Sequence, residues 1–462
     1  MSDLICISPV DNRELGRRPL LSGQELENVL ARARTAQREW MRVSINERAA
    51  SILRFVDAIR EMNEEIVPEL ALQMGRPVRY GGEFRSFEER IRYMVDIAER
   101  SLAPAAAFDS QTGTERYITR EPLGVVLTIA PWNYPYLTAA NSVVPALMAG
   151  NAVILKHAEQ TLLVGERFAA AFAKSGIPDG LFSNVVISHD QIARLIGAGE
   201  VNHVSFTGSV AAGRAIERAA AGSFTTVGLE LGGKDPGYVR HDADITKAVE
   251  SLVDGAFFNS GQCCCAIERV YVHESLFDEF VGRAVSIVGT YVLGNPLESG
   301  TTLGPMAATR FAEGVRKQIR EAVAAGAKPL IEPREFPADR EGTAYLAPQI
   351  LIDVNHTMRV MREETFGPVV GIMKVKSDEE AVSLMNDSPY GLTASIWTRD
   401  LAAARRLGER IETGTVFMNR CDYVDPGLAW TGVKDTGRGA SLSRLGYDSL
   451  TRPKSFHLRF AG

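Results

Sequence analysis

Apolar residues recur at helical spacing through the first hundred residues. Two successive sets share this period, and together they comprise Leu26, Val29, Leu30, Ala33, Ile52, Phe55, Val56 and Ile59. Because residues three and four apart lie on one face of a helix, the pattern predicts amphipathic helices from about residue 24 to 100. Helices with one apolar face must cover another layer of structure, which we expect later in the chain.

From residue 124 onward the pattern changes to short β-branched runs separated by helix-like segments. The runs are GVVLTI, NAVILK, VVIS, HVSFTG and TVGLEL, all within residues 124–231. Strands that alternate with helices predict a parallel α/β sheet. After about residue 232, a helix over about 244–258 and the runs RVYVH and PVVGIM predict a second α/β unit.

The stretch 124–155 is apolar enough to resemble a membrane span, but prolines and asparagines interrupt it. These are Pro131, Asn133, Pro135, Asn141, Pro145 and Asn151. Unpaired backbone groups are costly in lipid, so we expect two strands and a loop here instead. The final thirty residues are rich in glycine and arginine and close with SFHLRF, which predicts a loop and an edge strand.

Composition and charge narrow the function. The 462 residues are 45% hydrophobic and 23% charged, as in an ordinary globular chain of about three domains. The net charge of -6 comes without a long run of either sign, so we expect no nucleic-acid partner and no membrane surface. A small-molecule substrate is the expectation that remains.

The five cysteines predict a reducing compartment. Their number is odd and Cys263, Cys264 and Cys265 are adjacent, which makes a poor disulfide framework. The amino-terminal residues lack the apolar run of a signal peptide, so we expect a cytoplasmic protein. Without a CxxC pair or a nearby pair of histidines, we expect no zinc site, and nothing in the sequence favours a cysteine protease.

Three segments contain residue types suited to catalysis. A thiol in FFNSGQCCCAIERV could act as a nucleophile if its pKa fell below about 8.5, although buried cysteines are more often inert packing residues. Glu230 ends a predicted strand and is a candidate general base or a salt-bridged strand end. Asn133 lies between prolines and is a candidate oxyanion donor or a simple turn residue.

Two further segments are candidates for binding a dinucleotide. Gly208, Ser209 and Gly213 follow a strand and open a helix, where backbone N–H groups bind phosphate, although an ordinary tight turn has the same composition. Lys156 and Glu159 follow another strand, at the sheet edge where ribose hydroxyls are bound in doubly wound folds.

Taken in order, six segments resemble the aldehyde dehydrogenase superfamily, in its NAD(P)-dependent, non-acylating, hydrolytic form. They are PWNYP at 131–135, LKHAEQT at 155–161, FTGSVAAG at 206–213, LELGG at 229–233, FFNSGQCCCA at 257–266 and EETFGPVV at 363–370. The resemblance implies a Rossmann-like parallel-sheet cofactor domain, a second α/β catalytic domain and a small β oligomerisation arm. It also implies a homodimer or homotetramer.

The resemblance also implies roles for individual residues. Cys264 is the expected nucleophile, Glu230 the expected base for the deacylating water, and Asn133 with the backbone N–H of Cys264 the expected oxyanion hole. The expected cofactor residues are Trp132, Lys156, Glu159, Gly208, Ser209, Gly213, Leu231, Glu364 and Phe366. A carboxylate at Glu159 would repel a 2′-phosphate, so we expect NAD rather than NADP.

The substrate class depends on the residues expected around the thiol. These are Tyr134, Phe258, Cys263, Cys265 and Trp430, and an aromatic tunnel favours hydrophobic aliphatic or aromatic aldehydes. Arg420 could instead pair with a carboxylate, as in an enzyme acting on an acidic aldehyde such as succinate semialdehyde. A coenzyme A-acylating dehydrogenase and a non-catalytic scaffold are further alternatives.

The chain departs from the family pattern at several positions. Its amino end is shorter than in many members, which calls the family's first hairpin into question. Ser142 occupies a position where many members have lysine, so a proton relay through that lysine must be replaced or absent. Ala440 occupies a position where arginine is usual.

The resemblance predicts three domains. A dinucleotide-binding domain is expected over residues 1–103 and 123–232, and a catalytic domain over 233–435. An oligomerisation segment is expected over 104–122 and 436–462.

Overall fold

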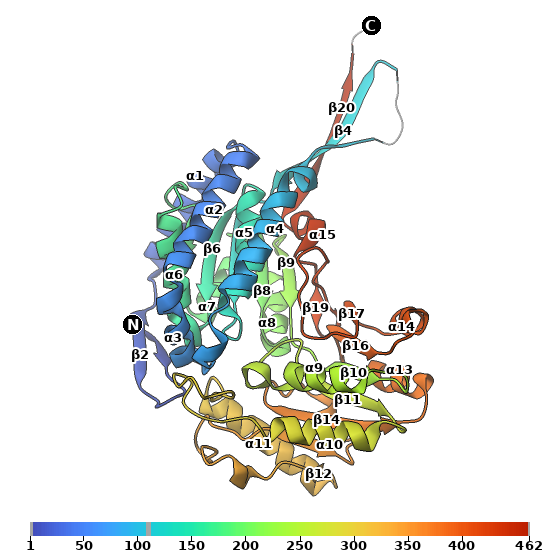
Figure 1. The fold of residues 1–462 in the computed structure, drawn as a ribbon. Helices are drawn as coiled ribbons and strands as arrows, with labels where there is room; N and C mark the ends of the chain where they lie inside the picture. Colours follow the sequence, from blue (N-terminus) through green and yellow to red (C-terminus); the bar gives the residue numbers. More distant parts are fainter. Residues whose placement is uncertain (1–2, 108–111, 461–462) are drawn as a thin grey trace.

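Two mainly parallel β-sheets and a long three-stranded antiparallel arm organise the chain in the computed structural model, which describes residues 3–107 and 112–460 (Figure 1). This mixed α/β architecture confirms the predicted fold class. Residues 108–111 of the predicted oligomerisation segment, and the chain ends at 1–2 and 461–462, lie outside the described residues.

The first sheet has a doubly wound order of parallel strands. The order is β9-β8-β5-β6-β7, and the strands are β5 (Val125–Ala130), β6 (Ala152–His157), β7 (Phe182–Asn184), β8 (His203–Thr207) and β9 (Thr226–Glu230). Both central strands are buried along their whole length, which explains their continuous apolar runs. The order reverses between β5 and β8, where such sheets bind ligands at the carboxyl ends of the strands.

The predicted amino-terminal helices are present and cover this sheet (Figure 1). They are α1 (Gly23–Trp40), α2 (Ile45–Glu61), α3 (Asn63–Met74) and α4 (Phe84–Leu102). Ser22 and Ser44 cap the first two helices and form capping boxes with Glu25 and Glu47, which fix where the helices begin. The helices α6 (Leu162–Ala173), α7 (His189–Gly197) and α8 (Val210–Ala220) connect the later strands.

Two expectations about the first sheet are wrong. The residues between β5 and β6 form helix α5 (Pro135–Met148) and not only a loop. Proline at the first helical position is compatible with a helix, and nearly every side chain of α5 is buried, so no polar face revealed its period. The run VVIS is also not a strand, because β7 ends just before it at Asn184.

A first hairpin is present despite the short amino end. Its strands are β1 (Asp3–Ile7) and β2 (Glu14–Pro19), which pair antiparallel. The sulfur of Cys6 lies 3.1 Å from the carbonyl oxygen of Gln160, beside the end of β6. The hairpin therefore lies next to the ligand-binding edge of the first sheet.

The second sheet has seven strands in the order β12-β13-β14-β11-β10-β16-β17, all parallel except the edge strand β12. They are β12 (Lys328–Pro329), β13 (Gln349–Ile352), β14 (Val369–Val375), β11 (Ile267–His273), β10 (Asp235–Val239), β16 (Thr393–Trp397) and β17 (Thr415–Met418). This sheet confirms the predicted second α/β unit, and the predicted boundary at 232–233 falls between β9 and β10.

Helices pack on both faces of the second sheet, as the division of its apolar residues into two clusters indicates. One face is covered by α9 (Ile245–Phe257) and α10 (Phe277–Val288), and the other by α13 (Asp378–Asn386) and α14 (Leu401–Gly408). Helices α11 (Thr309–Ala324) and α12 (Arg359–Arg362) lie beside β13 and β14. A short pair, β15 (Tyr390–Gly391) and β18 (Val433–Lys434), precedes the return of the chain to the first sheet.

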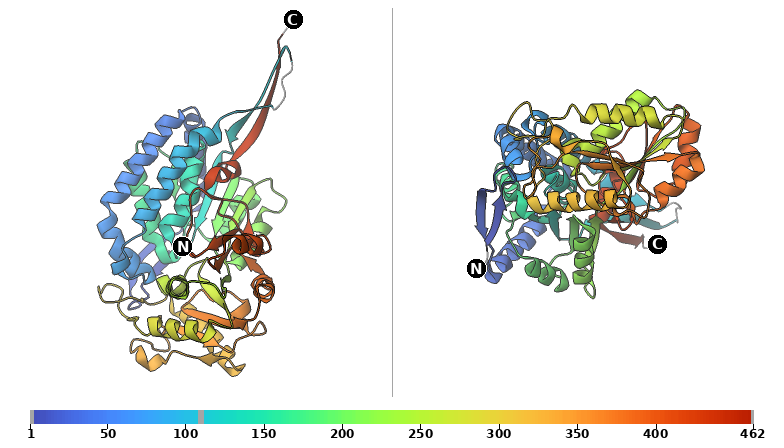
Figure 2. Two further views of the ribbon diagram at one scale, coloured as in Figure 1. Left: turned by 45° about the vertical axis from the view of Figure 1, so that its right-hand side comes forward. Right: turned by 90° about the horizontal axis from the view of Figure 1, so that it is seen from below.

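The carboxyl-terminal segment joins two parts of the molecule. Strand β19 (Gly437–Arg438) adds antiparallel to β9, and α15 (Ser443–Ser449) follows. Strand β20 (Thr451–Arg459) then pairs antiparallel with β4 (Thr114–Pro122), and β4 also pairs with β3 (Ala105–Ala106). This three-stranded arm projects away from the rest of the chain (Figures 1 and 2).

No helix in the described part of the chain is long and apolar enough to span a membrane.

Candidate active site

A cavity of about 1050 Å³ lies at the carboxyl ends of the first sheet and reaches the loop before β11. It is lined by all the predicted catalytic residues and by all but one of the predicted cofactor residues, namely Asn133, Glu230, Cys264, Trp132, Lys156, Glu159, Gly208, Ser209, Leu231, Glu364 and Phe366. The exception is Gly213, where an added Cβ would come within 2.6 Å of the Leu231 side chain, so its lack of a side chain permits close packing. The fold thus brings together segments that are far apart in sequence.

The loop that carries Cys264 is held in an unusual conformation. Asn259, Ser260 and Gly261 all have positive φ, which turns the chain sharply after helix α9. The buried Gln262 side chain accepts a hydrogen bond from the backbone N–H of Ala307 at 2.8 Å and donates to the carbonyl of Asn259 at 3.1 Å. These bonds fix the loop, so Cys264 is presented at a defined place in the cavity.

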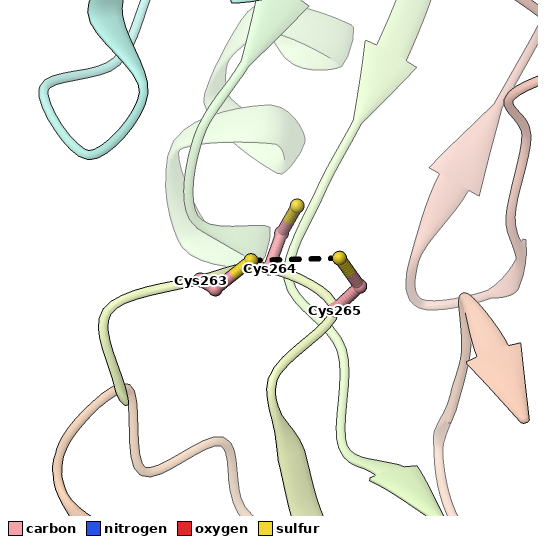
Figure 3. Close-up of side chains that lie close together, drawn as sticks. All are labelled: Cys263, Cys264 and Cys265. Atoms are coloured by element: carbon pink, nitrogen blue, oxygen red, sulfur yellow. Dashed lines mark hydrogen bonds between the residues drawn. The ribbon is translucent and has the colours of Figure 1, made fainter. Parts of the chain in front are cut away.

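The two flanking thiols differ from Cys264 in where they point. Cys263 and Cys265 face each other with their sulfurs 3.4 Å apart, while the Cys264 side chain extends away from that contact (Figure 3). Both flanking sulfurs also lie 3.2–3.4 Å from Oδ1 of Asp422. Hydrogen bonds from Cys263 and Cys265 lower the pKa of the Cys264 thiol, although burial opposes the shift. Cys264 is the most acidic thiol of the three, as a nucleophile requires.

Asn133 lies between β5 and α5, and its backbone carbonyl is clamped from two directions. It accepts a hydrogen bond from Nη2 of Arg76 at 2.6 Å and another from Nδ2 of Asn259 at 3.3 Å. Arg76 is itself paired with buried Glu83 at 2.9 Å, and Glu83 accepts from the backbone N–H of Leu137 at the start of α5. The Asn133 loop and the Cys264 loop are therefore joined by one direct hydrogen bond, and Arg76 bonds to Asn133 beside it.

Glu230, the last residue of β9, has an environment suited to a base. Its carboxylate accepts hydrogen bonds from the hydroxyls of Ser441 and Thr207, the latter at 3.3 Å. Burial raises the pKa of Glu230, and the two hydroxyls oppose the shift. A carboxylate whose pKa moves toward neutrality is a better proton acceptor from water at physiological pH.

One end of the cavity has features of an anion and ribose site. Gly208 follows β8, and Ser209 caps α8 by accepting a hydrogen bond from the backbone N–H of Ala212 at 3.3 Å. Lys156 is the penultimate residue of β6, one strand beyond β5 in the sheet, and burial lowers the pKa of its amine. Glu159 is exposed on the turn that follows, near the backbone N–H of Ile5. A helix N-terminus and a lysine at the same edge of one sheet suit a phosphate-bearing ligand.

The side of the cavity nearer Cys264 is formed by the segment around Glu364. Burial raises the pKa of Glu364 to about 8, and its Oε1 accepts from the backbone N–H of Gly233 at 3.2 Å. An added Cβ at Gly232 would meet the Glu364 carboxylate at 2.2 Å, so only glycine permits this approach. Phe366 has a positive φ and its ring meets Trp132 edge-on, with centroids 5.5 Å apart.

A set of apolar residues in the cavity was missed by sequence reasoning. They line the end near α7 and α8 and are Ile187, Ile192, Ala215, Ile216 and Ala219. Single aliphatic residues on helices give the same sequence signal whether they face a core or a cavity. Only the packing of α7 against α8 leaves this apolar slot open, and it suits a flat aromatic base.

The residues expected around the substrate lie outside this cavity. Tyr134 has the Arg76 guanidinium 4.7 Å above its ring, and Phe258 packs edge-on against Tyr80 at 5.1 Å. Trp430 is buried and forms an isolated antiparallel bridge with Ser441.

The structure also shows the contacts of the other residues expected near the substrate. Cys263 and Cys265 face Asp422 as described above. Arg420 is exposed and stacks 3.5 Å above the ring of Tyr423. The roles of these residues toward a substrate stay predictions.

The arrangement supports a specific kind of chemistry. An acidic thiol, an asparagine held by its backbone carbonyl and a carboxylate of raised pKa line one cleft. Features suited to an anion and a ribose lie at the other end of this cleft. Covalent attack on a carbonyl carbon followed by hydrolysis needs this combination of nucleophile, oxyanion donor and base.

Comparison with known proteins shows the family to which the chain belongs. The chain matches the model described as the aldehyde dehydrogenase family over residues 2–456. It is 36% identical to an aldehyde dehydrogenase of Paenarthrobacter nicotinovorans over 94% of both chains. It is 32% identical to the NAD(P)+ succinate semialdehyde dehydrogenase Sad of Escherichia coli, over 96% of this chain and 95% of that one. The structure of an NAD-dependent aldehyde dehydrogenase from Sinorhizobium meliloti superposes with a TM-score of 0.95 at 32% identity, covering all of this chain and 92% of the other.

Proposed function

Since this chain belongs to the aldehyde dehydrogenase family, whose members are oxidoreductases that oxidise aldehydes, we propose that it forms a covalent thioester on Cys264 and hydrolyses it to the carboxylic acid. The observation that carries the proposal is the convergence of Cys264, Asn133 and Glu230 on one cavity. That cavity continues past Lys156 and Gly208, far enough to hold a dinucleotide beside the thiol.

The proposed reaction has two halves. In the first, the Cys264 thiolate bonds to the aldehyde carbon, and the side-chain amide of Asn133 and the backbone N–H of Cys264 stabilise the oxyanion. Loss of one such donor typically costs about 10²–10³ in rate. The bound nicotinamide supplies the hydride acceptor. In the second half, Glu230 takes a proton from water as the water oxygen bonds to the acyl carbon, the C–S bond breaks and the thiolate is regenerated.

We propose that NAD is preferred over NADP. Glu159 supports this preference, because its carboxylate lies beside Lys156 in the region suited to a ribose and would repel a 2′-phosphate. We expect kcat/KM to be higher with NAD than with NADP, and Glu159→Gln to narrow the difference. Equal or better use of NADP by the unaltered enzyme would contradict the position assigned to Glu159.

The substrate that we propose is a hydrophobic aliphatic or aromatic aldehyde, which rests on the expectation from the family resemblance that Tyr134, Phe258 and Trp430 surround it. An acidic semialdehyde is the second candidate, supported by the resemblance to the Escherichia coli enzyme and by Arg420. NADH formation from a panel of aliphatic, aryl and acidic aldehydes separates the two candidates.

Two variants test the covalent mechanism. Cys264→Ala is expected to abolish aldehyde-dependent NADH formation. Glu230→Gln is expected to keep a first-turnover burst of NADH but to slow steady-state turnover by about 10²-fold or more, because only hydrolysis needs the base. Unchanged steady-state turnover in Glu230→Gln would show that Glu230 is not the base for hydrolysis.

Addition of coenzyme A to the assay tests the acylating alternative. Turnover that depends on added coenzyme A, with acyl-coenzyme A as the product, would favour that alternative over hydrolysis. Retention of NADH formation by Cys264→Ala would exclude Cys264 as the nucleophile.

Two properties outside the site complete the proposal. All five cysteines are free thiols, which supports a reducing, cytoplasmic location. The arm formed by β4 and β20 supports a homodimer or homotetramer, because it projects from the chain and exposes apolar side chains such as Leu458.

A further inference from the structure

Glu268 is a buried carboxylate to which the proposed reaction gives no role. It lies on β11, four residues after Cys264, and its side chain is 3% exposed. Its oxygens accept hydrogen bonds from the backbone N–H of Thr365 at 2.8 Å and of Phe366 at 2.9 Å, and from the fully buried ammonium of Lys234. Successive backbone N–H groups that converge on one anion hold it, and are held by it, in a defined geometry.

We propose that Glu268 is a positioning residue that fixes the segment 364–366 relative to the Cys264 loop, and thereby sets where the nicotinamide half of the dinucleotide lies against the thiol. The proposal rests on the proposed function, in which Glu364 and Phe366 contact that half of the cofactor. Glu268 itself does not line the large cavity, so it acts through these residues and not on the cofactor directly.

The backbone of Phe366 needs such an anchor. Its φ is 52°, in the left-handed region that residues with a side chain rarely adopt. Conformations of this kind persist only where the surrounding structure holds them. The N–H of this same residue donates to Glu268, while its ring lines the large cavity beside Trp132. The carboxylate therefore stabilises the backbone conformation that directs the ring into the cavity.

The side chain of Thr365 extends the same network to Glu364. Its hydroxyl accepts from Nζ of Lys234 at 2.9 Å and donates to Oε1 of Gln318 at 2.8 Å. The Gln318 amide in turn donates to the backbone carbonyl of Glu364 at 3.4 Å. Both Gln318 and Glu364 line the large cavity. Loss of the central carboxylate is thus expected to loosen Glu364 as well as Phe366.

Close backbone packing joins this segment to the thiol loop. An added Cβ at Gly261 would come within 2.3 Å of the carbonyl oxygen of Gly367, and one at Gly233 within 2.5 Å of the carbonyl oxygen of Cys264. Hydride transfer needs the nicotinamide at contact distance from the carbon bonded to the thiol, and a misplacement of about 1 Å can cost about 10²-fold in rate. A carboxylate that registers the two segments therefore has a catalytic consequence.

The experiment compares two ligands and needs no aldehyde. NAD contains both halves of the dinucleotide, whereas ADP contains the adenosine half and lacks the nicotinamide and its ribose. Titration calorimetry gives the Kd of each ligand. The burst of p-nitrophenolate from p-nitrophenyl acetate, measured without nucleotide, reports whether the Cys264 loop is intact.

Three variants are compared with the unaltered enzyme. Glu268→Gln keeps the shape of the side chain and one acceptor oxygen. Glu268→Leu combined with Lys234→Met removes the acceptor and both charges, so that no buried ion is left without its partner. Asp242→Asn is the matched control, because Asp242 also accepts from a backbone N–H and a hydroxyl, those of Arg399 and Thr398, but does not line the large cavity.

We expect the double variant to weaken NAD binding by about tenfold, as when a hydrogen bond to a charged group is misplaced, and to leave ADP binding and the ester burst unchanged. Single-turnover NADH formation at saturating NAD is expected to fall by about 10- to 100-fold. Glu268→Gln should show a smaller loss of both, because its amide oxygen still accepts. Asp242→Asn should match the unaltered enzyme.

Unchanged NAD affinity and NADH formation in both Glu268 variants would overturn the proposal. Equal weakening of NAD and ADP would also overturn it, since a general loss of structure affects both ligands. If the double variant does not fold, the comparison of NAD with ADP in Glu268→Gln decides.

Failure of the proposed function gives a different result. An unaltered enzyme that binds NAD but forms no NADH from any aldehyde would refute that function, while the two Kd values would still decide the role of Glu268.

Discussion

At the scale of single residues, the environment of Cys264 separates it from the two thiols beside it. Cys263, Cys264 and Cys265 are identical in chemistry, yet only the middle one lines the large cavity. The outer two lie against the buried carboxylate of Asp422 and against each other. The proximity of these two thiols lowers the pKa of the Cys264 thiol.

Replacing one donor tests this account. We expect Cys265→Ala to raise the pKa of Cys264 toward the ordinary thiol value of about 8.5, because the thiolate loses a neighbouring polar thiol that lowers its pKa. The fraction of thiolate at pH 7 then falls. The measurement is the pH dependence of Cys264 alkylation by iodoacetamide, followed by peptide mass spectrometry.

Two matched variants complete that test. Cys265→Ser keeps a donor and is expected to restore much of the shift. Cys421→Ala removes a buried thiol whose pKa burial raises to about 12 and is expected to change nothing at Cys264. An unchanged alkylation midpoint in Cys265→Ala would show that Asn133 and the loop backbone, rather than the flanking thiols, set the acidity.

At the scale of elements, the conformation of the turn between β5 and α5 depends on an ion pair whose two residues lie outside both elements. Arg76 follows α3 and Glu83 precedes α4, and their side chains are only 4% and 2% exposed. Arg76 holds the carbonyl of Asn133, while Glu83 holds the first turn of α5 through Leu137. The position of the oxyanion donor is therefore fixed by a neighbouring helical layer.

Breaking this pair has a predictable cost. Arg76→Met leaves Glu83 buried without its partner, and loss of one member of such a pair typically costs about 3–5 kcal/mol. We expect a lower urea midpoint of unfolding and a fall in kcat of about tenfold or more, with a smaller change in KM, since the role proposed for Asn133 is to stabilise the transition state.

A double variant distinguishes stability from positioning. Arg76→Met with Glu83→Leu removes both charges and is expected to recover much of the stability but not the lost kcat. Recovery of both would mean that Arg76 contributes to the fold alone, and the clamp on Asn133 would have no catalytic consequence.

At the scale of the whole molecule, the arm is the feature that a single chain does not explain. Strands β4 and β20 extend beyond the two sheets as a long ribbon (Figure 2), and β20 pairs only with β4 in the part of the chain that is described. Ile118 and Leu458 are 44% and 43% exposed on it. An exposed strand edge with apolar side chains is a site for association with a second chain.

A charged residue introduced on the arm tests whether the arm forms the contact between chains. We expect Leu458→Asp to lower the mass of the assembly measured by light scattering, because a buried unpaired charge at an interface is strongly unfavourable. His457→Asp places the same charge on the opposite face of β20 and is the matched control. A monomer in the unaltered protein, or the same mass in all three, would exclude the arm as the contact.

Much of this protein was determined by the sequence alone. Alternating apolar runs predicted the two parallel α/β units, because strands buried on both faces must be apolar throughout. The resemblance of six motifs, each weak by itself, to one family implied the catalytic residues and all but one of the cofactor residues that line the large cavity, whereas the residues expected around the substrate lie outside it. Helix α5 was missed because burial on all sides removes the polar face that reveals a helical period.

Only the tertiary structure decided how these residues act on one another. The clamp of Arg76 on Asn133, the thiols around Cys264 and the hydroxyl of Ser441 on Glu230 join residues 57, 1 and 211 positions apart. Acidity and orientation depend on distances in space, and periodicity along a chain shows neither where adjacent thiols point nor which distant segments meet.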